Sequence, residues 1–260
     1  MRTIAVCNLK GGVAKTTTVI NVAAVLARDY KQQVLVIDAD SQCNTTEFFG
    51  GGEPGTSTLA DLLRETRDGI NGTVEEYIRR TTFPGVSLVA ADDSLMDLDL
   101  TKVETNAVEV TVLRDVKEVL GEQDAFDWCL IDCPPAFNAA SAAALLAADE
   151  VLIPIKLDAF SLSGMVNLLR QIRNMREINP NLRLLGCLPT MWEGDNEDIK
   201  ALEELGKAGL PVLYPIRYTR KAKDMTYAQE PLLVSSPRSA AGVDYRRLVR
   251  ELVKGGKNNG

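Results

Sequence analysis

The feature that most constrains this chain is a glycine pair, Gly11-Gly12, which lies between an apolar stretch and an amphipathic one. Residues 3–7 have the apolar character of a buried strand, and from Lys15 onward apolar residues recur at helical spacing. Glycine lets backbone amides point at an anion without hindrance from Cβ, and a helix N-terminus adds partial positive charge. The sequence therefore predicts a phosphate-binding loop over residues 10–18. In such a loop Lys15 reaches the β- and γ-phosphates of a nucleotide, and the Thr16 hydroxyl binds Mg²⁺.

The loop differs from the general phosphate-loop pattern, which has glycine at the positions of Leu9 and Ala14. A lysine, Lys10, directly precedes its glycine pair. The form Lys-Gly-Gly-x-x-Lys-Thr resembles the deviant Walker A motif of the ParA/MinD family of ATPases, in which the two residues before the second lysine vary. The resemblance implies that Lys10 crosses a dimer interface and contacts the nucleotide of the partner subunit. It also implies nucleotide contacts from Lys10, Gly11, Gly12, Val13, Ala14, Lys15, Thr16 and Thr17. A glycine turn flanked by two surface lysines is the alternative interpretation.

A second run, residues 33–40, is largely apolar and ends in Asp38 and Asp40. Such a run suits a parallel strand covered on both sides, and ligands bind at the carboxyl ends of strands in α/β sheets, so both carboxylates should face the phosphate loop. Residues 38–44 resemble the second ParA motif, Asp-x-Asp-Pro-Gln-x-Asn, with Ser41 in place of proline. The resemblance implies that Asp40 orients or activates the attacking water and that Asp38 supports Mg²⁺. A capping or turn role for each aspartate is the alternative.

The third motif is residues 128–135, where four apolar residues end in Asp132 and two prolines follow. A Walker B strand presents its carboxylate to a Mg²⁺-bound water in this way, and the Asp-x-Pro-Pro form again resembles ParA proteins. A surface aspartate at a strand end is the alternative. From the three motifs we expect a metal site at Thr16, Asp38 and Asp132, and catalytic roles for Lys10, Lys15 and Asp40.

Composition excludes several kinds of site. The chain of 260 residues contains no histidine, which rules out acid–base chemistry by imidazole and the usual zinc sites. Its five cysteines form no CxxC pair, which indicates reduced thiols in a cytoplasmic protein. The sequence has no long apolar run and enters a strand at once, so we expect neither a membrane span nor a signal peptide.

Strand and helix patterns alternate along the chain, which predicts an α/β fold. We expect a three-layer P-loop NTPase-like fold with a mostly parallel twisted sheet and helices on both faces, as the ParA resemblance implies. A single domain is expected over residues 1–254, followed by a flexible polar tail over 255–260. Further strands are predicted at residues 86–91, 151–155, 182–189 and 212–216. Helices are predicted at residues 59–66, 74–81, 106–120, 163–178 and 243–253, and a flexible loop at 50–55.

Charge is unevenly distributed along the chain. The net charge is −7, yet residues 217–257 contain ten basic and four acidic residues. In ParA-like proteins, basic residues of this portion bind DNA through phosphates without reading its sequence. On this resemblance the expected DNA contacts are Arg217, Arg220, Lys221, Lys223, Arg238, Arg246, Arg247 and Arg250. The alternative is a set of ordinary solvated helix faces, with one arginine near the nucleotide.

The resemblance covers nearly the whole chain and implies a ParA-type ATPase for DNA segregation. In that mechanism ATP and Mg²⁺ promote a homodimer, the dimer binds nonspecific DNA, and a ParB-like or centromere-binding adaptor stimulates the hydrolysis that releases it. A cytoplasmic, nucleoid-associated location is implied. The family closes over the nucleotide base between Thr190 and Asn196. Because the phosphate loop begins within ten residues of the N-terminus, we expect no N-terminal helix-turn-helix domain and no sequence-specific DNA binding.

Two other functions are compatible with the motifs. A MinD-like membrane-associated regulator would use the basic amphipathic helix at residues 243–253, but this helix lacks bulky aromatic residues and a polar tail follows it. We therefore expect the helix to pack on the domain and expect no membrane partner. A metabolic or cluster-assembly ATPase of the same superfamily would invoke Cys129 and Cys133, whose spacing resembles no cluster motif.

Overall fold

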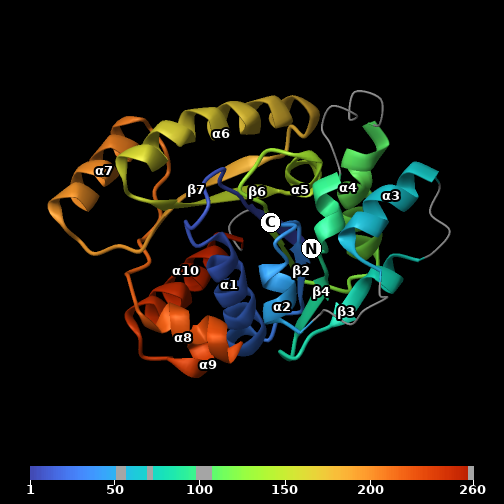
Figure 1. Ribbon diagram of the computed structural model, residues 1–260, viewed down its shortest axis with the longest axis horizontal. Coiled ribbons are helices and arrows are strands. Elements are labelled where there is room, and N and C mark those ends of the chain that lie inside the picture. The colour runs from blue at the N-terminus through green and yellow to red at the C-terminus, as the bar shows by residue number, and fades with distance from the viewer. Residues whose placement is uncertain (51–56, 69–72, 98–106, 257–260) are drawn as a thin grey trace.

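A seven-stranded sheet forms the centre of the molecule, with the strand order β3-β4-β2-β5-β1-β6-β7 (Figure 1). The computed structural model describes residues 1–50, 57–68, 73–97 and 107–256. Neighbouring strands run parallel, except that β3 is antiparallel to β4. The strands are β1 (Arg2–Val6), β2 (Val34–Asp38), β3 (Ile78–Arg80), β4 (Val86–Val89), β5 (Trp128–Asp132), β6 (Glu150–Lys156) and β7 (Arg183–Thr190).

Both faces of the sheet are buried, which explains why its strands are nearly continuous apolar runs. Successive residues of a strand point to opposite faces. In β1, Ala5 belongs to the apolar core on one face, while Ile4 and Val6 belong to the core on the other. In β2, Leu35 and Val36 are divided between the two cores in the same way.

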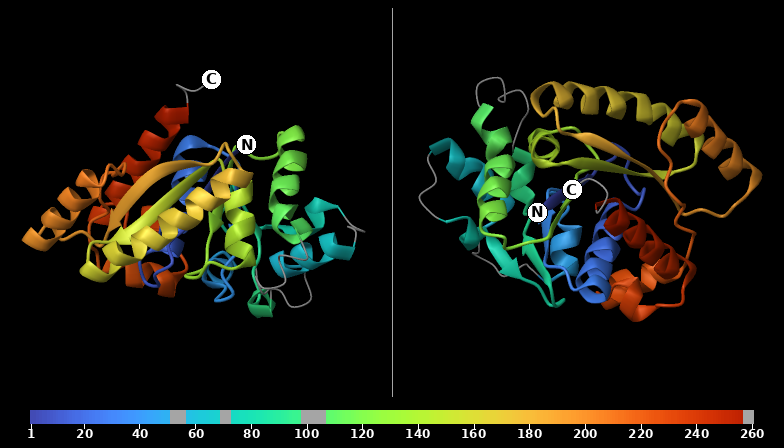
Figure 2. Two further views of the ribbon diagram at one scale, coloured as in Figure 1. Left: turned by 90° about the horizontal axis from the view of Figure 1, so that it is seen from above. Right: turned by 180° about the vertical axis from the view of Figure 1, so that it is seen from behind.

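Helices cover both faces of the sheet, and the three layers are visible in two further views (Figure 2). One face packs against α3 (Leu59–Asp68), α4 (Ala107–Glu122), α5 (Ala139–Ala147), α6 (Ala159–Ile178) and α7 (Asn196–Lys207). The other packs against α1 (Lys15–Tyr30), α2 (Asn44–Phe48), α8 (Lys221–Ala228), α9 (Leu232–Ser235) and α10 (Ala240–Gly256). The predicted three-layer α/β fold with a mostly parallel sheet is therefore confirmed.

The strand predicted at residues 212–216 is wrong. The segment runs beside β7 and donates from Leu213 and Ile216 to carbonyl oxygens of that strand, but in the described residues its pairing amounts to an isolated bridge between Val212 and Cys187. Pro215 has no N–H to donate, so a continuous ladder cannot form along this segment.

The helix predicted at residues 74–81 is also wrong, because this segment divides into two short elements. One 3₁₀ turn, η1 (Val74–Tyr77), leads directly into β3. The edge of β4 offers unpaired backbone groups, and β3 satisfies them by antiparallel pairing. A second 3₁₀ turn, η2 (Asp93–Asp97), follows β4.

Other predicted elements are observed with shifted ends, and α8 begins within residues 217–223, where a loop and the start of a helix were expected. The helices α2, α5, α7 and α9 were not predicted. The predicted loop at residues 50–55 and the predicted tail at 255–260 lie largely outside the described residues, as does Asn106 at the start of the predicted helix 106–120.

The last helix, α10, packs on the domain as predicted. Leu248, Val249 and Leu252 are buried in the same core as the apolar residues of α1. No helix in the described ranges has the length and apolar character to cross a membrane.

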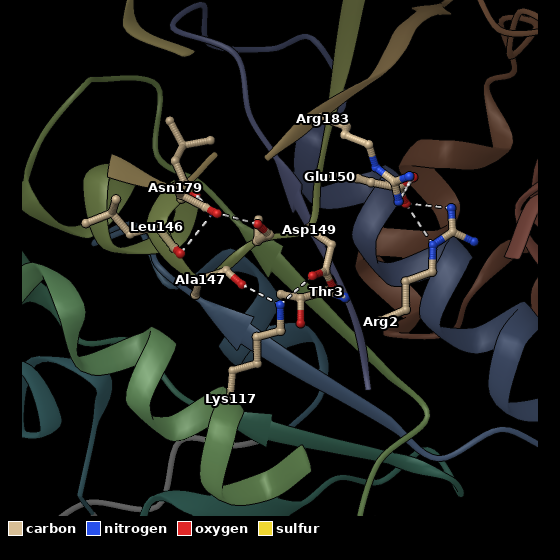
Figure 3. A network of polar contacts seen from close by, with 11 residues as sticks. Arg2, Thr3, Lys117, Leu146, Ala147, Asp149, Glu150, Asn179 and Arg183 are labelled. Atoms are coloured by element: carbon tan, nitrogen blue, oxygen red, sulfur yellow. Dashed lines mark hydrogen bonds and ion pairs between the residues drawn. The ribbon is translucent and has the colours of Figure 1, made fainter. Parts of the chain in front are cut away.

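A network of polar contacts secures the sheet at the end opposite the phosphate loop (Figure 3). The Arg2 guanidinium donates to Glu150 Oε2 at 2.7 Å and to the carbonyl oxygen of Leu252 at 2.5 Å. It also lies over the Trp128 ring, 4.7 Å from the centroid. These contacts tie the start of β1 to β5, β6 and the end of α10.

The second part of this network links β1 to α4. Asp149 accepts a hydrogen bond from the backbone N–H of Thr3 at 2.8 Å. It also forms an ion pair with Lys117 Nζ at 2.6 Å. The Thr3 residue is 1% exposed, yet its side-chain hydroxyl has no hydrogen-bond partner among the described residues. A buried hydroxyl without a partner destabilises a fold, because it has lost its hydrogen bonds to water.

Replacing Thr3 with valine should therefore stabilise the protein. Thr3→Val keeps the shape of the side chain and removes the unpaired hydroxyl, and we expect the free energy of unfolding to rise by about 1 kcal/mol. Urea unfolding followed by circular dichroism measures the change. Thr3→Ser keeps the hydroxyl and loses a buried methyl group, so it should destabilise; stabilisation by both variants would contradict the explanation.

Candidate nucleotide-binding site

The predicted phosphate loop connects the end of β1 to the start of α1. Gly12 has φ +71°, which glycine adopts without steric cost. Ala14, the residue before α1, has φ +64° and no side-chain cap. A non-glycine residue in this left-handed region costs about 1–2 kcal/mol, and such strain is typical of functional loops.

The loop presents unpaired backbone donors to open space. Residues 11 and 12 form a turn, and the N–H groups of Gly11, Gly12 and Ala14 have no hydrogen-bond partner within the described chain. A Cβ built on Gly11 or Gly12 would meet no atom within 4 Å. Free N–H groups beside a helix N-terminus favour an anion, so the loop fits a phosphate group.

The two lysines of the motif lie in different surroundings. Lys15 is 7% exposed, and its Nζ donates to the carbonyl oxygen of Lys10 across the loop at 3.1 Å. Lys10 Nζ contacts both carboxylate oxygens of Asp158, each at 2.8 Å. Asp158 lies two residues after β6. The lysine expected to reach a partner subunit is thus held by an ion pair within its own chain.

The three residues predicted to hold metal lie together. Asp38 and Asp132 end the adjacent parallel strands β2 and β5 and are direct register partners. The Thr16 hydroxyl donates to Asp132 Oδ2 at 2.7 Å. Burial raises the pKa of Asp38 to about 7, and the charge of Asp132 adds to the shift. Burial likewise raises the pKa of Asp132 to about 6.

This oxygen-rich pair of carboxylates fits Mg²⁺. Asp132 Oδ1 is buried and accepts no hydrogen bond from the described residues, so it remains an available acceptor. Mg²⁺ prefers oxygen ligands, and a divalent cation would offset the repulsion between two buried carboxylates. Thr16, Asp38 and Asp132 are the residues that could hold it.

Asp40 lies beside this pair at 8% exposure. Its backbone N–H donates to Asp38 Oδ1 at 3.2 Å, and its own Oδ1 accepts from the N–H of Gln42 at 3.1 Å. Both aspartates therefore accept hydrogen bonds within a turn, as the alternative interpretation of this motif expected. The same contacts keep Asp40 next to Asp38.

Two threonines that were not predicted complete the group. Thr45 and Thr46 are consecutive residues of α2, and their hydroxyls donate to Asp132 and Asp38 respectively. The sequence signal was a pair of hydroxyl residues directly after the second motif. The role of these hydroxyls as donors to the carboxylates becomes clear only when α2 is seen to lie against the ends of β2 and β5.

A hollow of about 90 Å³ lies beside the loop, next to Ala14 and Thr17. Its far wall includes Met191 and Tyr218. The two segments that form this wall are joined, since the N–H of Tyr218 donates to the carbonyl oxygen of Trp192. Thr190 at the end of β7 anchors the loop, because its hydroxyl donates to the carbonyl oxygen of Val13 at 3.1 Å. Thr190 and Met191 belong to the segment that the resemblance predicted to close over the base, whereas Tyr218 was not predicted.

The eight basic residues predicted to bind DNA are spread over α8, α10 and the adjoining loops. Four of them are neutralised locally: Arg217 pairs with Asp244, Lys221 with Asp224, Arg246 with Asp29 and Arg247 with Glu251. Arg217 also lines the hollow beside the phosphate loop. The remaining four, Arg220, Lys223, Arg238 and Arg250, are exposed and make no ion pair with the described residues.

Known proteins resemble the chain over most of its length. A family model described as an AAA domain matches residues 1–184. The chromosome partitioning protein ParA of Caulobacter vibrioides is 31% identical over 97% of this chain and 94% of its own length. The sporulation initiation inhibitor protein Soj of Bacillus subtilis is 30% identical over 97% of this chain and 98% of its own length.

Solved structures are similar to the chain in fold and, to a lower degree, in sequence. Cobyrinic acid a,c-diamide synthase from Mycobacterium smegmatis, with bound ATP analog and magnesium, has a TM-score of 0.82 and 28% sequence identity to this chain. The alignment covers 100% of this chain and 97% of that one. The similarity therefore extends well beyond the phosphate loop.

The buried carboxylate pair predicts that stability depends on pH in the metal-free protein. Asp38 holds its proton in the folded state up to about pH 7, whereas in the unfolded chain it releases the proton near pH 4. The folded state binds more protons between these values, so stability falls as pH rises through them, by at most about 1.4 kcal/mol per pH unit for this group.

Asp38→Asn should reduce this pH dependence and stabilise the chelator-treated protein near pH 8 by about 2 kcal/mol. Urea unfolding in the presence of a chelator, compared between about pH 5 and pH 8, measures both effects. Asp93→Asn, which changes an exposed aspartate, is the control. Equal pH dependence in the wild type and in Asp38→Asn would contradict the prediction.

Proposed function

Because the chain belongs to the ParA family of ATPases, we propose that it is an ATP-dependent DNA-partition ATPase. ATP with Mg²⁺ promotes a homodimer, the dimer binds nonspecific DNA, and a ParB-like or centromere-binding adaptor stimulates the hydrolysis that releases it. The observation that carries the proposal is the contact between Thr16 and Asp132. It joins the helix that follows the phosphate loop to the strand-end carboxylates, at the edge of the sheet where a Mg²⁺-nucleotide would bind.

The nucleotide occupies two adjoining parts of the site. Its phosphates bind the free N–H groups of the loop and Lys15, and its base lies in the hollow between Thr17 and Met191. Mg²⁺ is held through Thr16, Asp38 and Asp132. When bound, it neutralises charge on the phosphate oxygens.

Hydrolysis requires an oriented water and neutralisation of the charge that develops on the phosphoryl group. Asp40 orients the water as a hydrogen-bond acceptor beside the metal site, and Lys15 stabilises the charge from within the loop. Lys10 supplies the second positive charge from the partner subunit in the dimer.

Dimer formation therefore exchanges one ion pair for another. Lys10 leaves Asp158 in its own chain to reach the nucleotide of the partner. The side chains of Lys10 and Asp158 are 35% and 32% exposed, and a partly exposed pair of this kind contributes no more than about 1 kcal/mol. Contact with a phosphate can readily offset that loss.

Nucleotide-dependent DNA binding is supported by the position of α8. This helix presents Lys223 on the surface, and Arg220 directly precedes it. Its Met225 accepts from the Asn21 amide of α1 at 3.3 Å, and the amide of Gln229 donates to the carbonyl oxygen of Glu47 in α2 at 2.9 Å. The basic helix thus contacts both helices that begin at the nucleotide site.

A membrane-bound spatial regulator is a weaker alternative. That function would need an apolar helix face free to enter the interface between lipid and water. In α10, which the sequence offered for this role, Leu248, Val249 and Leu252 are at most 3% exposed. The face is already used in packing against the domain.

Lys15→Ala should abolish nucleotide binding, because it removes the positive charge held inside the loop. Titration with a fluorescent ATP analogue in Mg²⁺ measures the affinity, and we expect a loss of at least about 100-fold. Lys200→Ala on the outer surface of α7 is the matched control and should bind normally. Wild-type affinity in Lys15→Ala would remove the loop from the site.

The DNA step is tested with a random-sequence duplex and wild-type protein in ATP, in ADP and without nucleotide, each at low and raised salt. We expect binding that depends on ATP and weakens as salt rises. No binding in any nucleotide state would contradict the DNA proposal, and liposomes would be the next sample.

The double variant Arg220→Ala/Lys223→Ala should bind this duplex about 10-fold more weakly and reduce the slope of log affinity against log salt by about 1–2. The matched control, Lys200→Ala/Lys207→Ala on α7, removes the same charge from a different surface and should leave the slope unchanged. Equal loss in both variants would indicate a general charge effect and no DNA surface on α8.

A further inference from the structure

We propose that Thr45 is a positioning residue for Asp132, and that its hydroxyl holds the carboxylate in the orientation that receives Mg²⁺ with the nucleotide. The inference rests on the nucleotide site proposed above. Thr45 is the second residue of α2 and is 0% exposed. Its Oγ1 donates to Asp132 Oδ2 at 2.7 Å.

The two oxygens of Asp132 are used differently. Oδ2 accepts two short hydrogen bonds, from the hydroxyls of Thr16 and Thr45, both at 2.7 Å. Oδ1 is buried and accepts none from the residues that the structure describes. Two donors on one oxygen restrict rotation of the carboxylate plane. They leave the lone pairs of the other oxygen available to a ligand.

The Thr16 hydroxyl alone could not guarantee this arrangement, because it has a second task. A hydroxyl has one hydrogen and two lone pairs, so Thr16 can bind a cation through oxygen while its hydrogen points to Asp132. The orientation of the Thr16 hydroxyl then depends on the cation. Thr45 is not predicted to bind the cation, and it supplies a donor from a different helix that is present before any ligand arrives.

The contact links distant parts of the chain. Thr45 lies in the first turn of α2, so no carbonyl of this helix precedes it by one turn to accept its hydroxyl. Its Oγ1 donates to the end of β5, which is distant in sequence. Buried hydroxyls need a partner in any fold, so the contact by itself would suit a structural role. What gives it a functional meaning is that its acceptor is shared with Thr16.

The neighbouring residue repeats the pattern on the other carboxylate. Thr46 donates to Asp38 Oδ2 through both its backbone N–H and its hydroxyl, each at 2.8 Å. Its Oγ1 also accepts from the N–H of Ala91 at 2.9 Å. Consecutive residues of α2 thus hold the two carboxylates that repel each other across β2 and β5. Thr45 gives the clearer test, because the backbone N–H of Thr46 would still bind Asp38 without its hydroxyl.

The test compares Thr45→Val with Thr45→Ser. Binding of a fluorescent ATP analogue is titrated with Mg²⁺, and the analogue is also titrated in chelator. In Thr45→Val, we expect the half-saturating Mg²⁺ concentration to rise about 10–100-fold, the usual loss when a partner of a metal ligand is removed. Affinity in chelator should stay within about twofold of wild type, since the loop residues that bind phosphate are unchanged. Thr45→Ser retains the hydroxyl and should restore the Mg²⁺ dependence.

Thr3→Val is the matched control, because it removes a buried threonine hydroxyl at the opposite end of β1 and should leave the Mg²⁺ titration unchanged. If Thr45→Val does not fold, Thr45→Ala also lacks the hydroxyl, adds no bulk and takes its place. Wild-type Mg²⁺ dependence in the variant without the hydroxyl, or equal impairment in Thr45→Ser, would overturn the inference. If the wild type itself binds no nucleotide, the proposed function fails and this inference fails with it. A wild type that binds normally isolates the role of Thr45.

Discussion

The parallel pairing of β5 with both β1 and β2 is the constraint on which the whole site depends. Asp132 is in register with Val6 on one side and with Asp38 on the other. Three segments that are far apart in sequence therefore reach the same edge of the sheet at the same height. The phosphate loop begins where β1 ends, so no further device is needed to bring it to the carboxylates. The hydrogen bond from Thr16 to Asp132 then fixes the start of α1 against the end of β5.

This arrangement costs stability that the rest of the fold must offset. Asp38 and Asp132 are buried next to each other, and Ala14 is held in a left-handed conformation. Apolar layers on both faces of the sheet supply the opposing free energy, and hydroxyls from α1 and α2 solvate the carboxylates in place of water. The strained Ala14 and the buried carboxylates lie where a ligand is expected, and such departures from local rules are common at functional sites.

The parts of the fold that the sequence predicted are those set by local pattern. The central strands and the loop after β1 combine an apolar run with a glycine turn and a helical repeat, which are all readable in one segment. One wrong element depended on a partner elsewhere: residues 78–80 form an edge strand by pairing with β4. The helix α5 is apolar on every side and so has no amphipathic period. For α7, the Asp195 side chain caps the first turn, and that capping signal was readable but was missed.

For the site, single nucleotide-binding residues could be predicted from sequence, but the set of basic residues available to DNA could not. A count of charges over residues 217–257 says nothing about which cations pair within the chain, and four of the eight expected DNA contacts do so. Each proposed DNA contact releases roughly one counterion, and affinity multiplies with their number. One chain with four unpaired cations would therefore bind DNA weakly. Two chains held together double the number of contacts, and the second set then binds at high effective concentration. ATP could thus control DNA binding through dimer formation alone, without any change in the basic residues themselves.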